Sequence, residues 1–284
     1  MSAKKFLVPI LSATLVLAIV PNATAATKIP SKIISLSPSA TEDLFAIGAA
    51  KQVIAVDDLS NFPKNTPITK LSAFNPNVEA LIAYKPDLIV IQSTATKADS
   101  IITQLRNLKI AVYVEHTPNN LAEAYAEISQ LASITSHKTQ AAKVIASMKT
   151  AIAQSIATKK LRKSSKFFHE LDNTLYSATS STFIGKVYAD FNLTNIADGA
   201  ATADDDGYPQ LQSEYILKSD PQFIFLSDGE FGENAKTVAA RPGWAGISAV
   251  AFNKVVILPS DIPSRWGPRL VDFYQFVGNS ISTN

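Results

Sequence analysis

The chain has 284 residues and a mass of 30.5 kDa, a length that suits one large domain or two small ones. Hydrophobic residues make up 46% and charged residues 18% of it, so it can bury a sizeable core and is not a disordered polypeptide. The formal net charge is only +2, which excludes a nucleic-acid or membrane-surface binder driven by net charge. Because cysteine is absent, disulfides, thiolate metal sites and cysteine nucleophiles are excluded as well.

Residues 1–25 have the pattern of a secretory signal peptide. Lys4 and Lys5 form a positive start, residues 6–20 are largely apolar, and the small residues Ala23 and Ala25 predict cleavage after Ala25. A transmembrane anchor is the alternative, although the apolar run is short for one. No cysteine follows this run. We therefore expect an exported protein, periplasmic or extracellular, that is soluble after cleavage and is not a lipoprotein.

The first half of the mature chain, residues 26–136, alternates short apolar runs with helical stretches. Strands are predicted over 32–36, 53–56, 88–91 and 112–114, and a helical stretch over 101–108. Ser39, followed by Glu42 three residues later, has capping-box spacing and predicts that another helix begins at Ser39. Strands that alternate with helices indicate βαβ units and a mainly parallel sheet.

A long helix is predicted after this first α/β lobe. Apolar residues recur at three- and four-residue spacing from His137 to Lys160, without Gly or Pro, and the linking helix is placed at residues 137–162. The basic run 159–166 is better explained as a solvated helix end than as a nucleic-acid patch. A second α/β lobe follows over residues 163–284, with apolar strands at 167–168, 223–226 and 255–258 and a helix from Pro268.

The two halves share a register. Glu79 is followed seven residues later by Pro86, and Glu214 is followed at the same spacing by Pro221, each time between a helical stretch and a strand. A glutamate in the first turn of a helix is favoured by the helix dipole alone. That explanation does not require the same offset in both halves, so the two glutamates are singled out as a pair.

The motifs of several enzyme classes are missing. The sequence contains no G-x-S-x-G elbow, no phosphate-binding G-x-x-x-x-G-K loop, no H-E-x-x-H and no G-x-G-x-x-G. His116 and His169 each stand at a predicted strand end, where they could line a cleft and ligate a metal, or serve only as polar residues at a loop edge. No metal site is predicted.

A ligand site is expected where loops leave the carboxyl ends of the strands, because open α/β sheets bind ligands there. Aromatic residues from both halves fall in these loops and would suit a large, flat, partly apolar ligand. Any single aromatic residue could instead pack in the core. The candidate ligand-binding residues are Ser37, Pro38, Ser39, Asp58, Phe62, Phe74, Tyr208, Asp228, Arg265 and Trp266.

Several of these segments resemble one known family. Residues 33–42, 75–90, 207–210, 241–244 and 265–269 are similar, in this order, to the substrate-binding proteins of ABC importers for vitamin B12, haem and ferric siderophores. The resemblance implies the class III periplasmic-binding-protein fold, in which two Rossmann-like lobes with mainly parallel sheets are joined by one long α-helix. It also implies little hinge motion and a ligand held between the lobes.

The resemblance further implies partners. In the family, one surface glutamate per lobe docks into arginine pockets of the permease, and Glu79 and Glu214 fall at these positions. We expect a non-enzymatic monomer that works with a permease and its ATPase subunits, binds no nucleic acid and carries no covalent cofactor. The favoured ligand is a corrinoid such as cobalamin. A ferric-siderophore or haem binder is the alternative, and an exported hydrolase built on Asp228, Glu230 and Asp261 is less favoured.

Overall fold

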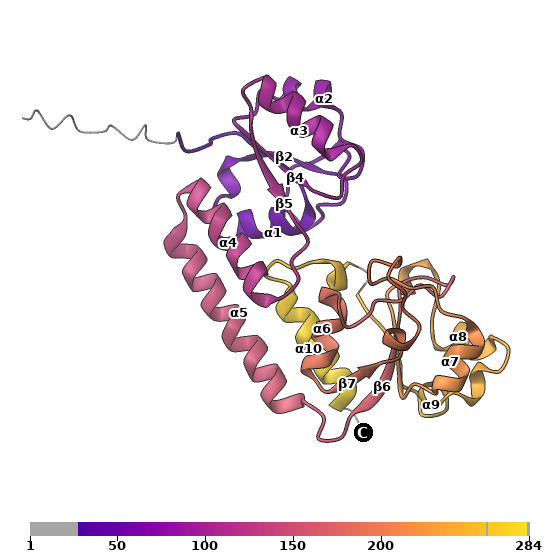
Figure 1. Cartoon of the computed structure of the whole chain (residues 1–284). Coiled ribbons are helices and arrows are strands. Elements are labelled where there is room, and N and C mark those ends of the chain that lie inside the picture. Colours follow the sequence, from indigo (N-terminus) through magenta and orange to yellow (C-terminus); the bar gives the residue numbers. More distant parts are fainter. Residues whose placement is uncertain (1–27, 260, 283–284) are drawn as a thin grey trace, which may run out of the picture.

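The computed structural model describes residues 28–259 and 261–282, so the predicted signal peptide lies outside the described residues. Two parallel sheets organise the chain, with strand orders β3-β2-β1-β4-β5 and β7-β6-β8-β9 (Figure 1). The first lobe contains β1 Ile33–Leu36, α1 Pro38–Ala46, β2 Val53–Asp57, β3 Ile68–Leu71, α2 Val78–Ala83, β4 Leu88–Gln92, α3 Ala98–Asn107, β5 Ala111–Glu115 and α4 Leu121–Thr135.

The second lobe follows the helix α5, which spans Lys138–Lys159. Its elements are β6 Ser165–Glu170, α6 Phe183–Asp190, β7 Leu193–Asn195, α7 Ser213–Ser219, β8 Phe223–Leu226, α8 Ala235–Ala240, α9 Ser248–Ala251, β9 Val255–Ile257 and α10 Leu270–Ser282. Short 3-10 turns lie at Ala50–Gln52, Ile196–Gly199, Gly229–Phe231, Trp244–Gly246 and Ile262–Ser264. The expected fold class, two parallel α/β lobes joined by one long helix, is confirmed.

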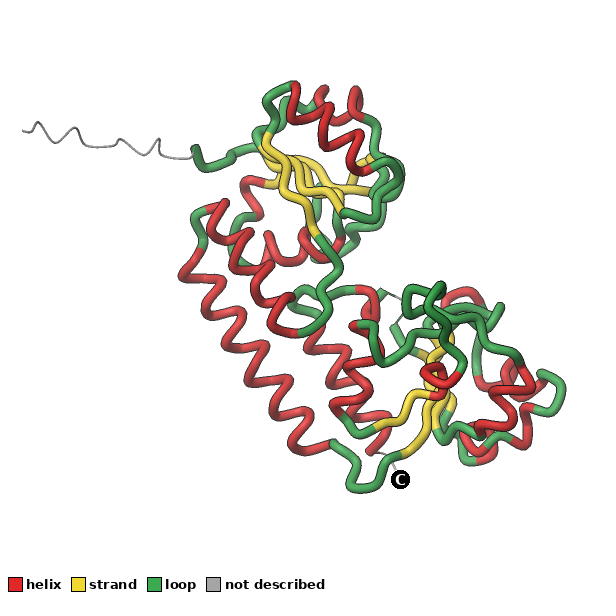
Figure 2. The backbone as a smooth tube through the Cα atoms, viewed as in Figure 1, coloured by secondary structure: helices red, strands yellow, loops and turns green. Residues whose placement is uncertain are grey.

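Helices cover both faces of each sheet (Figure 2), which explains why the central strands read as continuous apolar runs. In β4, Leu88 and Val90 face one apolar cluster, while Ile89 and Ile91 face another. The same alternation of side chains holds in β8, from Phe223 to Leu226. The strands that sequence reasoning missed, β3 and β7, are short edge strands with exposed positions, so they carry no such run.

The N-cap of the first helix lies two residues earlier than the capping-box spacing predicts. Ser37, not Ser39, is the N-cap, and its Oγ accepts a hydrogen bond from the Ala40 amide at 3.2 Å. Pro38 then occupies the first turn, where its fixed φ and missing amide hydrogen are tolerated. The predicted start at Ser39 is therefore wrong, and Glu42 is free to make a contact outside the helix.

One apolar cluster runs through both lobes. It includes Leu44 from α1, Met148 and Ile152 from α5, Phe225 from β8 and Phe273 from α10. Helix α4 lies beside the first part of α5 and α10 beside its last part (Figure 1), so α5 contacts both of them along this cluster. The lobes are therefore joined by shared packing as well as by the chain.

A glycine allows a close contact between α5 and α10. A Cβ atom on Gly278 of α10 would lie 3.1 Å from Lys159 Cβ and 3.1 Å from Ser155 Oγ, both on α5. The missing side chain lets the two helices approach each other near their ends. Nearby, the Ser155 hydroxyl donates to the Tyr274 carbonyl at 3.2 Å.

We expect thermal unfolding to occur in one cooperative transition, because the two lobes share a core. Ile152→Ala should lower the free energy of unfolding by about 2–4 kcal/mol, since a buried side chain is truncated and a cavity is left. Gln154→Ala, at an exposed position of the same helix, is the control and should change it by less than about 0.5 kcal/mol. Calorimetry that resolves two transitions, only one of them moved by Ile152→Ala, would contradict the shared core.

Candidate functional site

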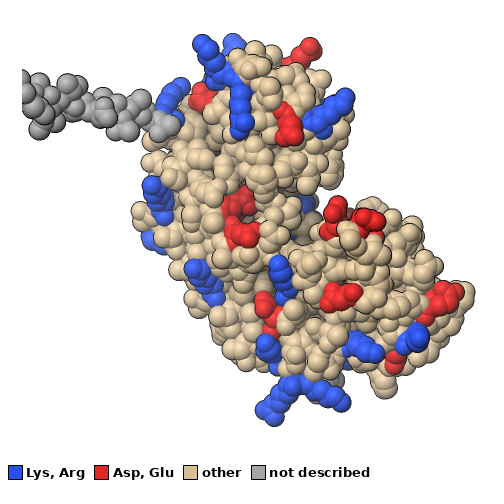
Figure 3. Space-filling view, in the orientation of Figure 1, with Lys and Arg blue, Asp and Glu red and all other residues tan. Residues whose placement is uncertain are grey.

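The carboxyl ends of both sets of strands point toward the space between the lobes, and the space-filling view is hollowed there (Figure 3). Exposed side chains in these loops come from both lobes: Asp58, Phe62 and Phe74 from the first, and Tyr208 from the second. Sequence reasoning left out Phe231, which follows β8 and is 82% exposed. This hollow between the lobes is called the cleft below.

A buried carboxylate shapes the loop after β2. Asp57 Oδ1 accepts a hydrogen bond from the Leu59 amide and Oδ2 accepts one from the Ser60 hydroxyl, each at 2.7 Å. The Ser60 hydroxyl lies 3.0 Å from Thr41 Oγ1, which ties the loop to α1. Burial raises the pKa of Asp57, and the Ser60 hydrogen bond opposes the shift. The loop that carries Asp58 and Phe62 is thus held by side chains beneath it.

Four of the expected ligand-binding residues are buried: Asp228, which is 4% exposed, and the three residues Ser37, Pro38 and Ser39 at the start of α1. Ser37 caps α1, Pro38 stands in its first turn, and Ser39 Oγ lies 3.4 Å from the Trp266 amide. Their side chains support the floor of the cleft at the α1 N-terminus.

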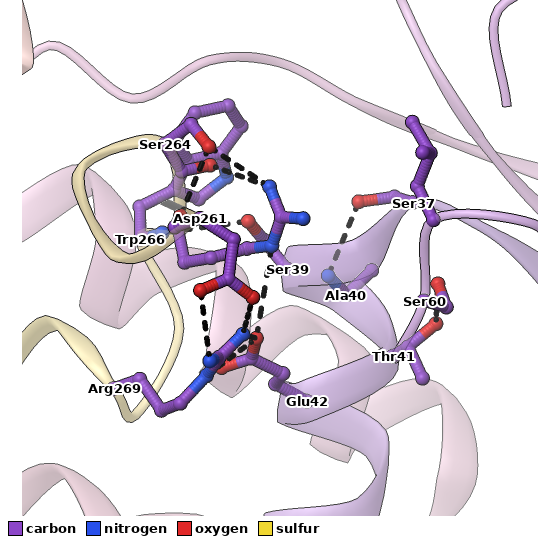
Figure 4. Close-up of polar contacts among 12 residues, drawn as sticks. Ser37, Ser39, Ala40, Thr41, Glu42, Ser60, Asp261, Ser264, Trp266 and Arg269 are labelled. Carbon is purple, nitrogen blue, oxygen red and sulfur yellow. Dashed lines mark hydrogen bonds and ion pairs between the residues drawn. The ribbon is translucent and has the colours of Figure 1, made fainter. Parts of the chain in front are cut away.

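The segment Asp261–Arg269, called the clasp here, packs on α1 of the first lobe (Figure 4). Arg269 donates to Glu42 Oε1 from Nη2 at 2.5 Å and from Nε at 3.0 Å, and also donates to Asp261 Oδ2 at 2.9 Å. The Arg269 guanidinium also stands 4.6 Å from the centre of the Phe62 ring. Residues 227 positions apart in the sequence therefore connect the lobes and fix an aromatic residue of the cleft.

Two candidate residues of the clasp are largely enclosed. Trp266 packs against the shared core, and its Nε1 donates to Glu115 Oε1 at 3.2 Å. The Arg265 side chain is 12% exposed, with Nη1 donating to Ser264 Oγ at 2.9 Å. Burial lowers the pKa of Arg265, which Glu42 and Asp261 partly offset.

Arg241 organises the loops of the second lobe. Its Nη1 and Nη2 each donate to one Glu170 carboxylate oxygen at 2.6 Å, and Nη2 also donates to Glu233 at 2.7 Å. The guanidinium stacks 4.7 Å from the Trp244 ring centre. This arrangement anchors the loop 227–234, which carries Asp228 and Phe231, to the end of β6.

The two histidines at strand ends have different surroundings. His169 is buried, with Nδ1 2.8 Å from the Tyr188 hydroxyl and Nε2 3.1 Å from the Ser227 hydroxyl. Burial lowers the pKa of His169 to about 3, so the ring is neutral. His116 is exposed beside the cleft. Among residues 28–259 and 261–282, no group of three His, Asp or Glu side chains is placed to hold a metal ion.

Three buried carboxyl groups lie behind the clasp, and sequence reasoning did not single them out. Asp43 comes from α1, Glu115 from the end of β5 and Glu127 from α4; each has an oxygen without a hydrogen-bond partner. Burial, and then the neighbouring carboxyl groups, raise the pKa of Asp43, and burial and Glu115 raise the pKa of Glu127. Mutual repulsion and poor solvation of the carboxylates favour the protonated form of these carboxyl groups.

Glu79 and Glu214 occupy equivalent places in the two lobes. Each is exposed and is the second residue of its helix, α2 or α7, and these helices lead into β4 and β8. The strands β4 and β8 in turn pair with β1 and β6, the first strands of their sheets. The shared sequence register thus corresponds to a shared place in the fold.

A pocket of about 710 Å³ lies away from the cleft. It is lined by residues at the amino ends of β4 and β5 and at the end of α4, among them Leu88, Ala111 and Ile134. Loops of the second lobe take no part in this pocket. We place the candidate site in the cleft, because exposed aromatic side chains from both lobes gather there.

Comparison with known proteins gives a consistent result. The model of the family described as "Periplasmic binding protein" matches residues 33–262. The chain is 30% identical over 261 residues to an uncharacterized ABC transporter substrate-binding lipoprotein of Bacillus subtilis, covering 89% of this chain and 81% of the relative. It is also 27% identical to a vitamin B12-binding protein of Pectobacterium carotovorum, covering 87% of each.

Solved structures agree in fold. A periplasmic haem-binding protein of Vibrio cholerae matches with a TM-score of 0.78 and 22% identity, covering 89% of this chain and 99% of that one. A periplasmic vitamin B12-binding protein of the same species matches with a TM-score of 0.72 and 22% identity, covering 89% and 97%. At this identity the likeness concerns the fold and does not choose between the two ligands.

One expectation is contradicted by the comparisons. The Bacillus subtilis relative is named a lipoprotein, in conflict with the expectation that this protein is not one. That expectation depended only on the absence of a cysteine. In the part of the chain that the structure describes, no helix is both long and apolar enough to cross a membrane.

The buried acid cluster makes stability depend on pH. The pKa of Glu127 is raised from 4.5 to about 9, so its contribution to stability is fully present below pH 4.5 and is lost as the pH rises toward 9. Glu127→Gln, which mimics the protonated form, should flatten the fall in the free energy of unfolding between pH 5 and pH 9 by about 1–3 kcal/mol. Urea denaturation at pH 5, 7 and 9 measures this.

The charge-matched control is Asp99→Asn, at an exposed position near the start of α3. Its pH profile should run parallel to that of the wild type. Parallel profiles for wild type and Glu127→Gln would show that Glu127 is ionised in the folded protein at neutral pH.

Proposed function

This chain belongs to the periplasmic binding protein family, as an ABC transporter substrate-binding protein of the vitamin B12, siderophore and haem group, and we propose on that premise that it captures a metal chelate in the cleft. Its family membership confirms the expectation that it is a binding protein and not an enzyme. The bound chelate is delivered to a membrane permease driven by ATPase subunits. We expect the protein to work as a monomer in this delivery.

The observation that carries the proposal is the set of exposed aromatic side chains on both sides of the cleft. Phe62 is 42% exposed and Phe74 60% exposed on the first lobe, and Tyr208 and Phe231 are exposed on the second. Large apolar side chains left in water across from one another favour a broad, partly apolar ligand. The Ser227 hydroxyl lies 3.1 Å from His169 Nε2, but burial lowers the pKa of His169 to about 3, which makes this ring a poor general base and favours binding over hydrolysis.

A corrinoid is the favoured chelate. Relatives named vitamin B12-binding or cobalamin-binding proteins cover most of the chain at 25–27% identity, and the aromatic walls suit a flat macrocycle. A haem or ferric-siderophore ligand is the alternative. Haem needs an axial ligand such as His116 or Tyr208. A siderophore carboxylate would need Arg265, whose side chain is only 12% exposed.

Calorimetry with cyanocobalamin, cobinamide, hemin and ferric siderophores should show binding of at least one chelate at micromolar concentration. Phe74→Ala and Tyr208→Ala should each weaken this binding by about 1–3 kcal/mol, because aromatic contact area is lost. Phe252→Ala is the matched control: Phe252 is 72% exposed but precedes β9, at the far end of the sheet from the cleft. No binding of any chelate would contradict the proposed function. Equal losses of affinity in all three variants would show that the ligand binds elsewhere.

We further propose that Glu79 and Glu214 dock the protein on its permease. Two exposed carboxylates at equivalent places in the two lobes match a membrane partner with two equivalent subunits. Bidentate contacts from arginine side chains would fix the orientation, and the first contact would raise the effective concentration of the second. Neither glutamate makes an ion pair in the described structure, so both are available to a partner.

Replacing both glutamates with alanine should abolish most ligand uptake by the reconstituted importer. Ligand affinity and melting temperature of the isolated protein should stay unchanged, because both side chains lie on the surface away from packing. Asp99→Ala, also exposed in the first turn of a helix, is the control and should transport normally. Normal uptake by the double variant would contradict the docking role, as would lost ligand binding.

A further inference from the structure

The loops of the second lobe that face the cleft are strongly acidic. Residues 171–182, 196–212 and 227–234 follow β6, β7 and β8, and they contain no lysine or arginine. Figure 3 shows acidic side chains gathered on the side of the second lobe that faces the first. We call these three loops the acidic rim; its carboxylates are Asp172, Asp198, Asp204, Asp205, Asp206, Asp228, Glu230 and Glu233.

The facing loops of the first lobe do not balance this charge. The loops after β2 and β4 carry one acidic residue, Asp58, and two lysines, Lys64 and Lys97. The two arginines of the clasp lie beside two carboxylates: Arg269 bridges Glu42 and Asp261, and Arg265 Nε lies 3.9 Å from Glu42. The negative potential of the rim is therefore not cancelled by the opposite wall of the cleft.

Some carboxylates of the acidic rim make contacts within the protein, and others make none in the described structure. Asp205 accepts hydrogen bonds from Thr202, and Glu233 pairs with Arg241. Asp204, Asp206 and Glu230, by contrast, are exposed and make no hydrogen bond or ion pair through their carboxylates in the described structure. Three charges are thus left facing solvent at the cleft.

Two of these free carboxylates stand next to exposed aromatic side chains. Asp206 and Gly207 both take left-handed backbone conformations, with φ of 47° and 87°, in the tight turn that presents Tyr208. In the next loop Glu230 directly precedes Phe231, within one 3-10 turn. An aromatic face beside a carboxylate attracts cations by both its quadrupole and the neighbouring charge, and it repels anions.

Asp228 is a second, independent feature of the acidic rim. Its side chain is 4% exposed, and neither carboxylate oxygen has a hydrogen-bond partner. Its charged neighbours are Glu233, Arg241 and Asp172, and Arg241 already binds two other carboxylates. A buried carboxylate without a partner is costly unless a proton or a positive group compensates it.

We propose that the cleft selects chelates by charge: cationic and neutral chelates are bound, and anionic chelates are rejected by the acidic rim. This inference rests on the proposed function, because it names the class of chelate that the same cleft takes. The aromatic walls supply contact area to any flat ligand. The rim then decides between ligands of similar size through long-range repulsion or attraction.

Calorimetry with chelates of different charge tests the proposal. The cationic probes are diaquacobinamide and ferrioxamine B, and the anionic probes are hemin, with its two propionates, and a ferric tricatecholate. At low salt the tighter cationic probe should bind at least about tenfold more tightly than either anionic probe, and the ratio should shrink at 0.5 M salt as screening grows. Anionic probes that bind as tightly as cationic ones would overturn the proposal and leave the proposed function standing. If no probe binds, the proposed function fails and this inference with it.

A variant locates the effect. Asp204→Asn, Asp206→Asn and Glu230→Gln combined should weaken the cationic probe about tenfold and strengthen an anionic probe, because three unit charges near the ligand are removed. The control is Asp99→Asn on the first lobe, which changes charge away from the rim and should leave both affinities unchanged. Circular dichroism and the melting temperature check that each variant is folded. If the triple variant keeps both affinities of the wild type, the rim does not select the ligand.

Discussion

An apolar core shared by the two lobes is the constraint on which the rest of the structure depends. The long helix α5 and the last helix α10 pack against each other, and side chains from both sheets, such as Ile33 of β1 and Phe225 of β8, reach the same cluster. Because this packing is continuous, a large rotation of one lobe against the other would have to expose part of it to water. The loops at the carboxyl ends of the strands are therefore held across from one another. The cleft follows from this arrangement.

Buried polar contacts then fix the positions of the loops that the shared core brings to the cleft. The clasp brings Arg269 onto Glu42 across the lobes, and the same guanidinium covers the ring of Phe62. In the second lobe Arg241 ties Glu170 to the loop that carries Phe231. A buried ion pair often adds little net stability, since both charges lose their water. Its consequence here is positional, because each arginine holds an aromatic loop of the cleft in one place.

The two lobes treat carboxyl groups in opposite ways. In the first lobe Asp43, Glu115 and Glu127 are buried together. Burial raises the pKa of each, which favours their protonated forms. In the second lobe the side chains of Asp204 and Glu230 are exposed to solvent instead. Composition alone gives a chain close to neutral. The uneven distribution of the charged residues makes one wall of the cleft negative, and a charged ligand in the cleft would encounter this asymmetry.

Local patterns in the sequence were enough for the fold class and for the paired glutamates. Apolar runs predicted the central strands, a Gly- and Pro-free periodic stretch predicted α5, and a repeated offset to proline singled out Glu79 and Glu214. Each of these signals lies within about 25 residues, because helix and strand periodicity are properties of neighbouring residues. Edge strands such as β3 and β7 were missed, since short half-exposed strands lack the apolar run.

Only the tertiary structure decided what the candidate site residues do. Ser37, Pro38 and Ser39 look like a binding loop in sequence, yet they are buried because the clasp, more than two hundred residues later, covers the start of α1. Glu42, a plausible capping residue, instead pairs with Arg269. No local pattern encodes such contacts, because they exist only once the shared core has brought α1 and the clasp together. The sequence by itself determined the two lobes, the helix between them and the loops that could form a site, while packing between distant segments decided which side chains those loops leave exposed.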